Sequence, residues 1–211
     1  MEQTRFIACN FMHKFAIGTK QEMTQVFNEE GRVFPATILK MDSLKVTQVK
    51  GSEKDGYEAI QVGGGVKSDK NINNAQKKIG SFRFLRELRL KKPSDAKVGD
   101  EMDMSVFEKG DIVTVSAISK GKGFQGGVKR YGFKGGRRSH GNKHAERQPG
   151  SIGATGPQRV FKGTRMAGRM GTDKVSVKNL KVLDFDIEKG LLYIGGAVPG
   201  RRGTLVTVRG N

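Results

Sequence analysis

The stretch between Lys120 and Gly171, here called the basic segment, constrains this chain more than any other feature because it cannot supply a hydrophobic core. Its 52 residues include thirteen lysines and arginines, fourteen glycines and one acid, Glu146. The other residues of the 211-residue chain carry 26 basic and 20 acidic side chains, so this segment contributes +12 of the net charge of +18. Burial of so little apolar surface gains too little free energy to offset the conformational entropy that the chain loses when it becomes ordered. We therefore expect an external polyanion, and first of all nucleic acid, to neutralise it.

A solvated, disordered basic loop without a partner is the plain alternative. Disordered segments are usually rich in Ser, Pro and Glu, whereas this one combines Gly with aromatic residues and Arg. The composition therefore favours a binding segment.

The composition of the whole chain limits its class. A pI near 10.2 favours RNA, DNA or anionic lipid as the partner. No apolar run has the length of a membrane span and none resembles a signal peptide, so we expect a soluble protein. Cys9 is the only cysteine, which excludes an intrachain disulfide and suggests a reducing compartment. We expect its side chain to be a small buried hydrophobe in an N-terminal strand.

The sequence around the basic segment predicts short β-strands. Runs rich in Val, Ile and Thr alternate with turn-prone Gly, Asp, Asn and Pro, at residues 33–39, 44–50, 57–62, 111–119, 175–184, 191–194 and 204–209. One helix is expected at about 72–79, and 81–90 is ambiguous with a preference for strand. Many short strands at this spacing favour a mostly β fold, a closed barrel or a sandwich, with little helix.

The predicted strands suggest two parts. Residues 1–119 together with 172–211 would form the β-barrel domain, and 120–171 would be an extended arm inserted between two strands. Structureless loops of this length are rare unless they are functional or ordered by a partner. Glycine also lets the backbone approach a phosphate chain closely.

The string from Gly121 to Gly126 fits the G-x-G-x-x-G pattern of dinucleotide sites. Such a site needs a helix next and an acid about twenty residues on. Residues 127–133 are poor helix material, and Glu146 is the one acid at that distance. The glycines are better interpreted as points of close approach to a nucleic-acid backbone, and we expect no nucleotide cofactor.

His140 and His144 are spaced as two metal ligands on one helix face. A third ligand is missing from the neighbourhood, and Gly141 weakens the helix that they would need. We expect no metal. Contacts to phosphate or base are one interpretation of these histidines, and exposed side chains without a role are the other.

Four aromatic residues, Phe124, Tyr131, Phe133 and Phe161, are interleaved with the basic side chains. Rings beside Arg and Lys suit stacking on unpaired bases while the charges follow phosphates. The alternative, equally weighted for Phe124 and Phe161, is that the rings anchor the base of the arm to the barrel. Met166 and Met170 suggest one short helical turn packed on the barrel.

Catalysis finds little support in the sequence. Acids elsewhere lie beside lysines in mixed-charge turns, and no nucleophile–base pattern or paired carboxylate in an apolar setting occurs. We expect no catalytic residue, no small-molecule substrate and no membrane association.

A set of motifs resembles a known family. These are Ser119-Lys120-Gly121-Lys122-Gly123-Phe124, Val128-Lys129-Arg130, His140-Gly141, Pro149-Gly150-Ser151-Ile152-Gly153, Val160-Phe161-Lys162-Gly163, Met166-Ala167-Gly168, Met170-Gly171 and Gly196-Ala197-Val198-Pro199-Gly200. They resemble the signature of the bacterial ribosomal protein L3 family of the large subunit, over nearly the whole chain.

The resemblance implies a barrel similar to those of elongation factors and a loop that runs through ribosomal RNA towards the peptidyl-transferase centre. It also implies a structural role in the cytoplasmic ribosome, early assembly, and large-subunit RNA and neighbouring large-subunit proteins as partners. The expected RNA-binding residues are Lys120, Lys122, Lys129, Arg130, Lys134, Arg137, Arg138, His140, Lys143, His144, Arg147, Arg159, Lys162, Arg165 and Arg169. The expected arm tip is Ser151, Ile152, Gly153, Ala154, Thr155, Gly156, Pro157 and Gln158. A free-standing RNA-binding protein or RNA chaperone is the alternative.

Overall fold

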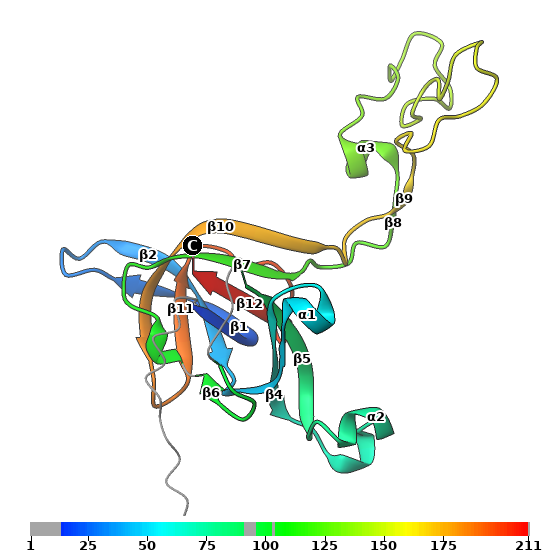
Figure 1. Ribbon diagram of the computed structural model, residues 1–211. Coiled ribbons are helices and arrows are strands. Elements are labelled where there is room, and N and C mark those ends of the chain that lie inside the picture. The colour runs from blue at the N-terminus through cyan, green and yellow to red at the C-terminus, as the bar shows by residue number, and fades with distance from the viewer. Residues whose placement is uncertain (1–13, 91–95, 103, 211) are drawn as a thin grey trace, which may run out of the picture. The chain divides into compact units, whose positions relative to one another are not determined.

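The computed structural model of the chain describes residues 14–90, 96–102 and 104–210, which divide into two compact units. The first unit contains the described residues up to Ile118 and from Val175 onwards, and the second unit runs from Ser119 to Lys174. Figure 1 shows the course of the chain. Cys9, for which the sequence predicts a buried strand position, lies outside the described residues.

The first unit is built on a sheet that closes into a ring of six strands. The ring has the order β1-β12-β7-β10-β11-β2, and its strands are β1 (Phe15–Phe27), β2 (Val33–Met41), β7 (Ile112–Ile118), β10 (Lys174–Asp186), β11 (Leu191–Gly195) and β12 (Leu205–Gly210). On β7, alternate residues enter the interior, so that Val113 and Val115 are buried while Ile112 and Ile118 are exposed. The interior of the ring is therefore an apolar core.

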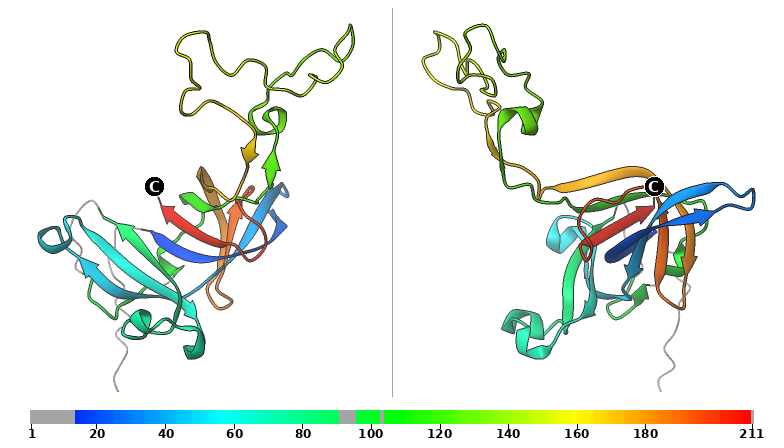
Figure 2. Two further views of the ribbon diagram at one scale, coloured as in Figure 1. Left: turned by 90° about the vertical axis from the view of Figure 1, so that its right-hand side faces the viewer. Right: turned by 180° about the vertical axis from the view of Figure 1, so that it is seen from behind.

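A second sheet of four strands belongs to the same unit, and Figure 2 shows it from two sides. Its order is β5-β4-β3-β6, with β3 (Leu44–Lys50), β4 (Ala59–Val66), β5 (Phe82–Arg89) and β6 (Glu101–Met102). Phe15 and Ile17 of β1 share one core cluster with Leu44, Ile60 and other residues of this sheet. Strand β1 therefore contributes to both cores of the first unit.

Helix is scarce in the described residues, as the sequence predicts. The first unit has α1 (Ser52–Asp55), α2 (Asn74–Lys77) and two 3-10 turns, η1 (Asp69–Asn71) and η2 (Met104–Val106). Helix α2 lies inside the range where the sequence predicts one, and β5 confirms the preference for strand at 81–90. No helix of the described chain is both long and apolar enough to cross a membrane.

Candidate nucleic-acid interface

An antiparallel pair of chain segments opens the second unit. The pair contains the short strands β8 (Phe124–Gln125) and β9 (Gly168–Arg169). It is extended by hydrogen bonds from Ser119 N–H to the Asp173 carbonyl and from Lys122 N–H to the Met170 carbonyl, both 2.9 Å. The two ends of the basic segment are thus held side by side by backbone bonds.

A short helix follows β8, contrary to the sequence expectation that 127–133 is not helical. Helix α3 (Gly127–Tyr131) begins after Gly126 and ends at Gly132, which has the left-handed φ of 73°. The Phe133 ring lies so close to Gly127 that a Cβ at position 127 would be 2.8 Å from it. Glycine usually disfavours the interior of a helix, but Gly126 and Gly132 lie at the two ends of α3, and Gly127 leaves room for the Phe133 ring. Irregular loops follow α3, and an antiparallel pair flanks it, so the parallel strands of a dinucleotide-binding unit are not formed by this segment.

The first loop after α3 is held by a few defined contacts. Gly136 N–H donates to the Glu146 carbonyl at 2.9 Å, and Asn142 Oδ1 accepts from Ala145 N–H at 3.1 Å. Gly135 has a φ of 76°, and a Cβ there would be 2.0 Å from the Glu146 carbonyl oxygen. The backbone at residue 135 therefore approaches the backbone at residue 146 so closely that position 135 requires glycine.

The second loop contains the expected tip, all of whose residues are exposed. The Ser151 hydroxyl donates to the Gly153 carbonyl at 2.7 Å, and the Thr164 hydroxyl donates to the Phe161 carbonyl at 2.8 Å. At the end of this loop the Met166 carbonyl accepts a hydrogen bond of 2.8 Å from Arg130 Nη1. Arg130 thus connects α3 to the returning chain.

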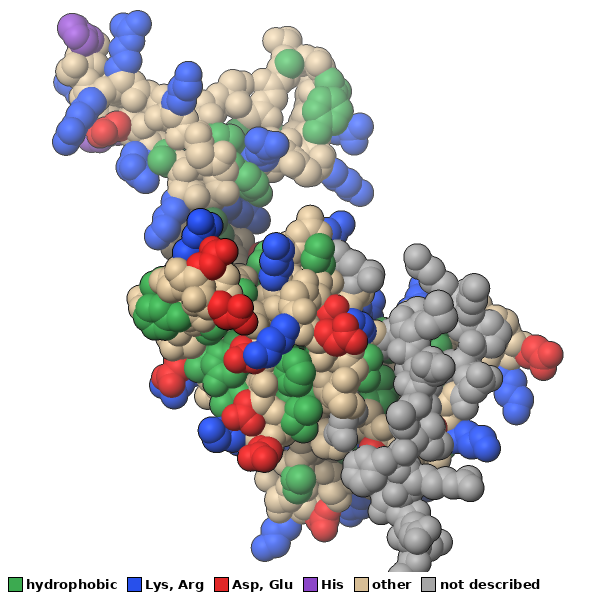
Figure 3. Space-filling model, turned by 90° about the vertical axis from the view of Figure 1, so that its left-hand side faces the viewer, with side chains coloured by type: hydrophobic (Ala, Val, Ile, Leu, Met, Phe, Trp, Pro, Cys, Tyr) green, Lys and Arg blue, Asp and Glu red, His purple; other side chains and the backbone are tan. Residues whose placement is uncertain are grey.

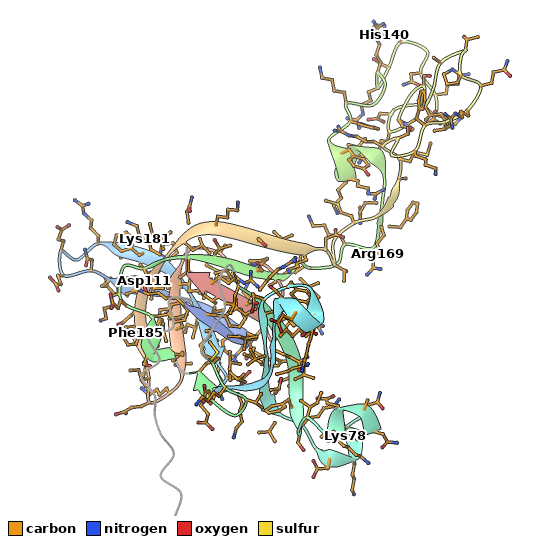
Figure 4. All side chains as sticks on the ribbon, in the orientation of Figure 1. Lys78, Asp111, His140, Arg169, Lys181 and Phe185 are labelled. Atoms are coloured by element: carbon orange, nitrogen blue, oxygen red, sulfur yellow. The ribbon has the colours of Figure 1, made fainter. Side chains whose placement is uncertain are left out.

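The expected RNA-binding side chains are almost all presented to solvent. All are exposed except Arg130, which is half-buried. Figure 4 shows the His140 side chain at the end of the first loop, pointing away from it, and Arg169 at the antiparallel pair. In Figure 3, many Lys and Arg side chains stand on the unit that carries the histidines. Fourteen lysines and arginines of Ser119–Lys174 oppose only Glu146 and Asp173, so this surface is strongly cationic.

The aromatic rings of the basic segment differ in their surroundings. Arginines lie over Tyr131, with Arg130 at 4.9 Å and Arg165 at 5.7 Å from the ring centre. Phe124 and Phe161 are 77% and 56% exposed, and Arg159 lies 5.7 Å from the centre of the Phe161 ring. Their surfaces can therefore take a flat partner such as a nucleobase.

An open cleft in the second unit adds a concave surface. It has a volume of about 440 Å³ and is lined by the backbone of Gly135, Gly136 and Gly150 together with Phe133, Lys134 and Gln148. In such a cleft the Phe133 ring can stack on the face of a base, Lys134 can contact a phosphate, and the Gln148 amide can hydrogen-bond to the edge of the base.

Met166 and Met170 do not form a helical turn, because β9 lies between them and pairs with β8, so that expectation is wrong. The two histidines do not share a helix face either, since His140 has a φ of 58° and His144 lies outside any helix. Among the described residues, no group of three His, Cys, Asp or Glu side chains is placed to hold a metal.

Residues that shape the loops were missed by the sequence interpretation. Asn142 accepts from Ala145 N–H and its amide donates to the Arg137 carbonyl, which closes the turn of the first loop. Gln125 similarly donates to the Lys122 carbonyl before α3. The Gly141-Asn142 pair is a common turn signal and could have indicated the role of Asn142.

A comparison with family models and a comparison with individual proteins point to the same family. Residues 94–190 match the family model described as "Ribosomal protein L3". Proteins named "Large ribosomal subunit protein uL3" are similar over most of their length. The one from Mycobacterium avium is 49% identical over 206 residues (93% of this chain and 95% of the relative). The one from Nocardia farcinica is 46% identical over 200 residues (92% and 90%). The one from Finegoldia magna is 43% identical over 202 residues (93% and 97%). These matches confirm the resemblance found from the motifs.

Proposed function

Because this chain belongs to the ribosomal protein L3 family, we propose that it is a structural component of the large ribosomal subunit that binds large-subunit RNA. The basic segment makes the main RNA contact, and the first unit fixes its position on the particle. The proposed role is not enzymatic, and the site of action is the cytoplasmic ribosome.

One observation carries this proposal: the excess of twelve positive charges on Ser119–Lys174 is displayed largely on exposed side chains. Charges of one sign held this close repel one another, and an RNA backbone replaces the counterions that would otherwise screen them. The cations would contact phosphates, whereas Phe124, Phe161 and the cleft beside Phe133 suit unpaired bases.

The finer parts of the proposal follow from family membership. The six-stranded ring is a barrel of the elongation-factor type, and residues 120–171 form an arm inserted between two of its strands. The arm extends through ribosomal RNA towards the peptidyl-transferase centre with residues 151–158 at its tip. Binding to the RNA helps to start subunit assembly, next to neighbouring large-subunit proteins.

The salt dependence of binding tests the RNA contact. If six to eight phosphates are neutralised, log K for large-subunit RNA should fall with log salt at a slope of about −4 to −7. The measurement is a titration of the full chain with that RNA at several salt concentrations. A flat response contradicts the proposed interface.

Matched charge removals locate the RNA-binding surface. The variant Lys122→Gln, Lys134→Gln, Arg137→Gln, Arg147→Gln removes four charges of the basic segment. Its slope should become shallower by about one for each phosphate that the variant no longer neutralises. The control, Lys54→Gln, Lys70→Gln, Lys77→Gln, Lys78→Gln, removes four charges of the first unit and should change the slope much less.

Retention on the particle separates the proposal from a free-standing RNA chaperone. A component of the subunit stays bound when large subunits are sedimented in high salt, whereas a loose binder is washed off. Loss of the chain under these conditions would favour the chaperone.

A further inference from the structure

The hairpin between β1 and β2 continues beyond the ring. Strand β1 pairs with β12 only over residues 15–19, and β2 pairs with β11 only over 36–40. Beyond these registers, residues 25–27 of β1 pair with 33–35 of β2, and Met23 and Thr24 pair with Thr37 and Ala36 of the ring. We call residues 23–27 together with 33–35 the ribbon. Its turn is closed by hydrogen bonds from Asn28 N–H to the Arg32 carbonyl (2.9 Å) and from Gly31 N–H to the Asn28 carbonyl (2.8 Å).

One face of the ribbon is mostly apolar and is exposed. Phe27 lies directly opposite Val33, and Met23 and Pro35 lie on the same face, which also contains the exposed Gln25 opposite Pro35. Phe27 is 67%, Met23 51% and Val33 49% exposed, and Pro35 is exposed as well. Two-stranded ribbons are marginally stable in water, and grouped exposed apolar side chains mark interaction surfaces more often than chance. This face therefore has the properties of a contact surface.

The ribbon contains more acids than bases, unlike the chain as a whole. Residues 21–35 carry Glu22, Glu29 and Glu30 but only one basic residue, Arg32, a net charge of −2 in a chain of +18. Two of these acids form ion pairs, Glu30 with Arg32 at 3.4 Å and Glu22 with Arg202 at 3.5 Å. Figure 3 faces the side of the first unit from which the hairpin of Figure 1 projects, and there acidic, basic and hydrophobic side chains are interspersed. An apolar surface with an acidic edge complements an apolar patch surrounded by Lys and Arg.

Other occupants fit this face less well. RNA is repelled by the acids and gains little from aliphatic side chains. A second copy of the chain would bring Glu29 and Glu30 close to the same acids. Addition of a strand to the edge of β2 is opposed by Pro35, which has no N–H to donate.

We propose that the ribbon face, formed by Met23, Phe27, Val33 and Pro35 with Glu29 and Glu30 at its edge, is a docking surface for a basic protein of the same particle. The inference rests on the proposed function, since it places the chain among protein neighbours. It goes beyond that function by assigning a surface separate from the RNA-binding segment, together with the chemistry of its partner.

Photo-crosslinking in the assembled large subunit tests this surface. The chain carries a benzophenone amino acid in place of Val33, and the crosslinked peptides are identified by mass spectrometry. The expected product joins position 33 to an apolar stretch flanked by Lys or Arg in another protein. Removal of the aromatic side chain by Phe27→Ser should lower the yield of this crosslink about tenfold or more. The double charge reversal Glu29→Lys, Glu30→Lys should lower the yield about tenfold.

A matched control uses Ile112, which is also 49% exposed and lies on a strand of the same unit. Ile112→Thr should leave the crosslink at position 33 unchanged. A crosslink to RNA, to a second copy of the chain, or to no partner overturns the inference, as does a yield that is insensitive to both substitutions. The RNA affinity of each variant is measured in parallel. Normal RNA binding without the crosslink refutes the docking surface alone, whereas failure of the unsubstituted chain to bind RNA refutes the proposed function.

Discussion

The ion pair of Lys14 and Asp111 is a single contact that joins the entry of the ring to the start of β7. Lys14 Nζ lies 2.7 and 2.6 Å from the two carboxylate oxygens, and the Asp111 side chain is 19% exposed. Burial alone would raise the pKa of the Asp111 carboxyl. Hydrogen bonds from Lys14 and from the Glu108 N–H (2.8 Å) outweigh burial and hold this pKa below its usual value.

A lowered pKa makes the contribution of Asp111 depend on pH. The stabilisation is complete above the usual value of 3.8 and is lost as the pH falls through the lower folded value. Asp111→Asn should therefore reduce the free energy of unfolding by about 1 kcal/mol at pH 7, and the difference should shrink below pH about 4. Urea unfolding at several pH values measures it, with the exposed Glu53→Gln as control. A difference that persists in strong acid would show that the carboxylate is not its source.

Gly135 offers a residue-scale test of the shape of the first loop. Gly135→Ala places a methyl group 2.0 Å from the Glu146 carbonyl oxygen, whereas Gly141→Ala, at a similar φ of 84°, meets nothing within 4 Å. Both substitutions carry the strain of a left-handed backbone, so their difference isolates the collision. Gly135→Ala should weaken RNA binding about tenfold more than Gly141→Ala. Equal affinities would mean that the loop geometry does not matter for binding.

At the scale of elements, strands with a regular apolar pattern are predictable from sequence and interrupted ones are not. Leu44–Lys50 matches its prediction, whereas β1 was missed because Lys20, Gln21 and Glu22 interrupt its apolar pattern. The register of β1 with β2 shifts between Lys20 and Met23, so the interruption corresponds to a bulge inside a continuous strand.

Glycines explain other differences between prediction and structure. Strand β4 continues to Val66 through Gly63, Gly64 and Gly65, where the sequence suggested an end at 62. A Cβ at Gly63 would be 2.5 Å from the Phe82 ring, and one at Gly64 would be 2.7 Å from Phe84. These glycines therefore make room for rings of β5, a tertiary effect that local propensity does not contain. The cationic site, in contrast, depends on composition and is visible in the sequence alone.

Removal of the basic segment tests whether the ring is an independent element. Deletion of residues 121–168 leaves Lys120 next to Arg169, and the bond from Ser119 N–H to the Asp173 carbonyl can still close the connection. The ring should unfold cooperatively with a free energy of unfolding within about 1 kcal/mol of that of the full chain, because both apolar cores are retained. RNA affinity should fall about a thousandfold or more. A control deletion of residues 68–79 should weaken RNA binding far less, and retained affinity after the first deletion would place the interface elsewhere.

At the scale of the whole molecule, the chain separates two physical tasks. The first unit contains two apolar cores and 25 basic against 19 acidic side chains, whereas the second unit has exposed cations and few buried side chains. The free energy that orders the first unit comes from burial of its own side chains. The second unit has too little apolar surface for this, so its order should depend on the polyanion that we propose it binds.

Hydrogen exchange of the full chain with and without large-subunit RNA tests this dependence. In the free protein, amides of residues 132–166 should exchange at rates close to those of an unfolded chain, while those of β7 and β12 stay protected. Addition of RNA should slow exchange in 132–166 by about tenfold or more, and a polyanion such as heparin serves as the control for charge alone. Slow exchange of 132–166 in the free protein would mean that its internal bonds, such as the one between Gly136 and Glu146, suffice to order it. RNA would then bind a preformed surface, and the cations would tolerate their mutual repulsion without a partner.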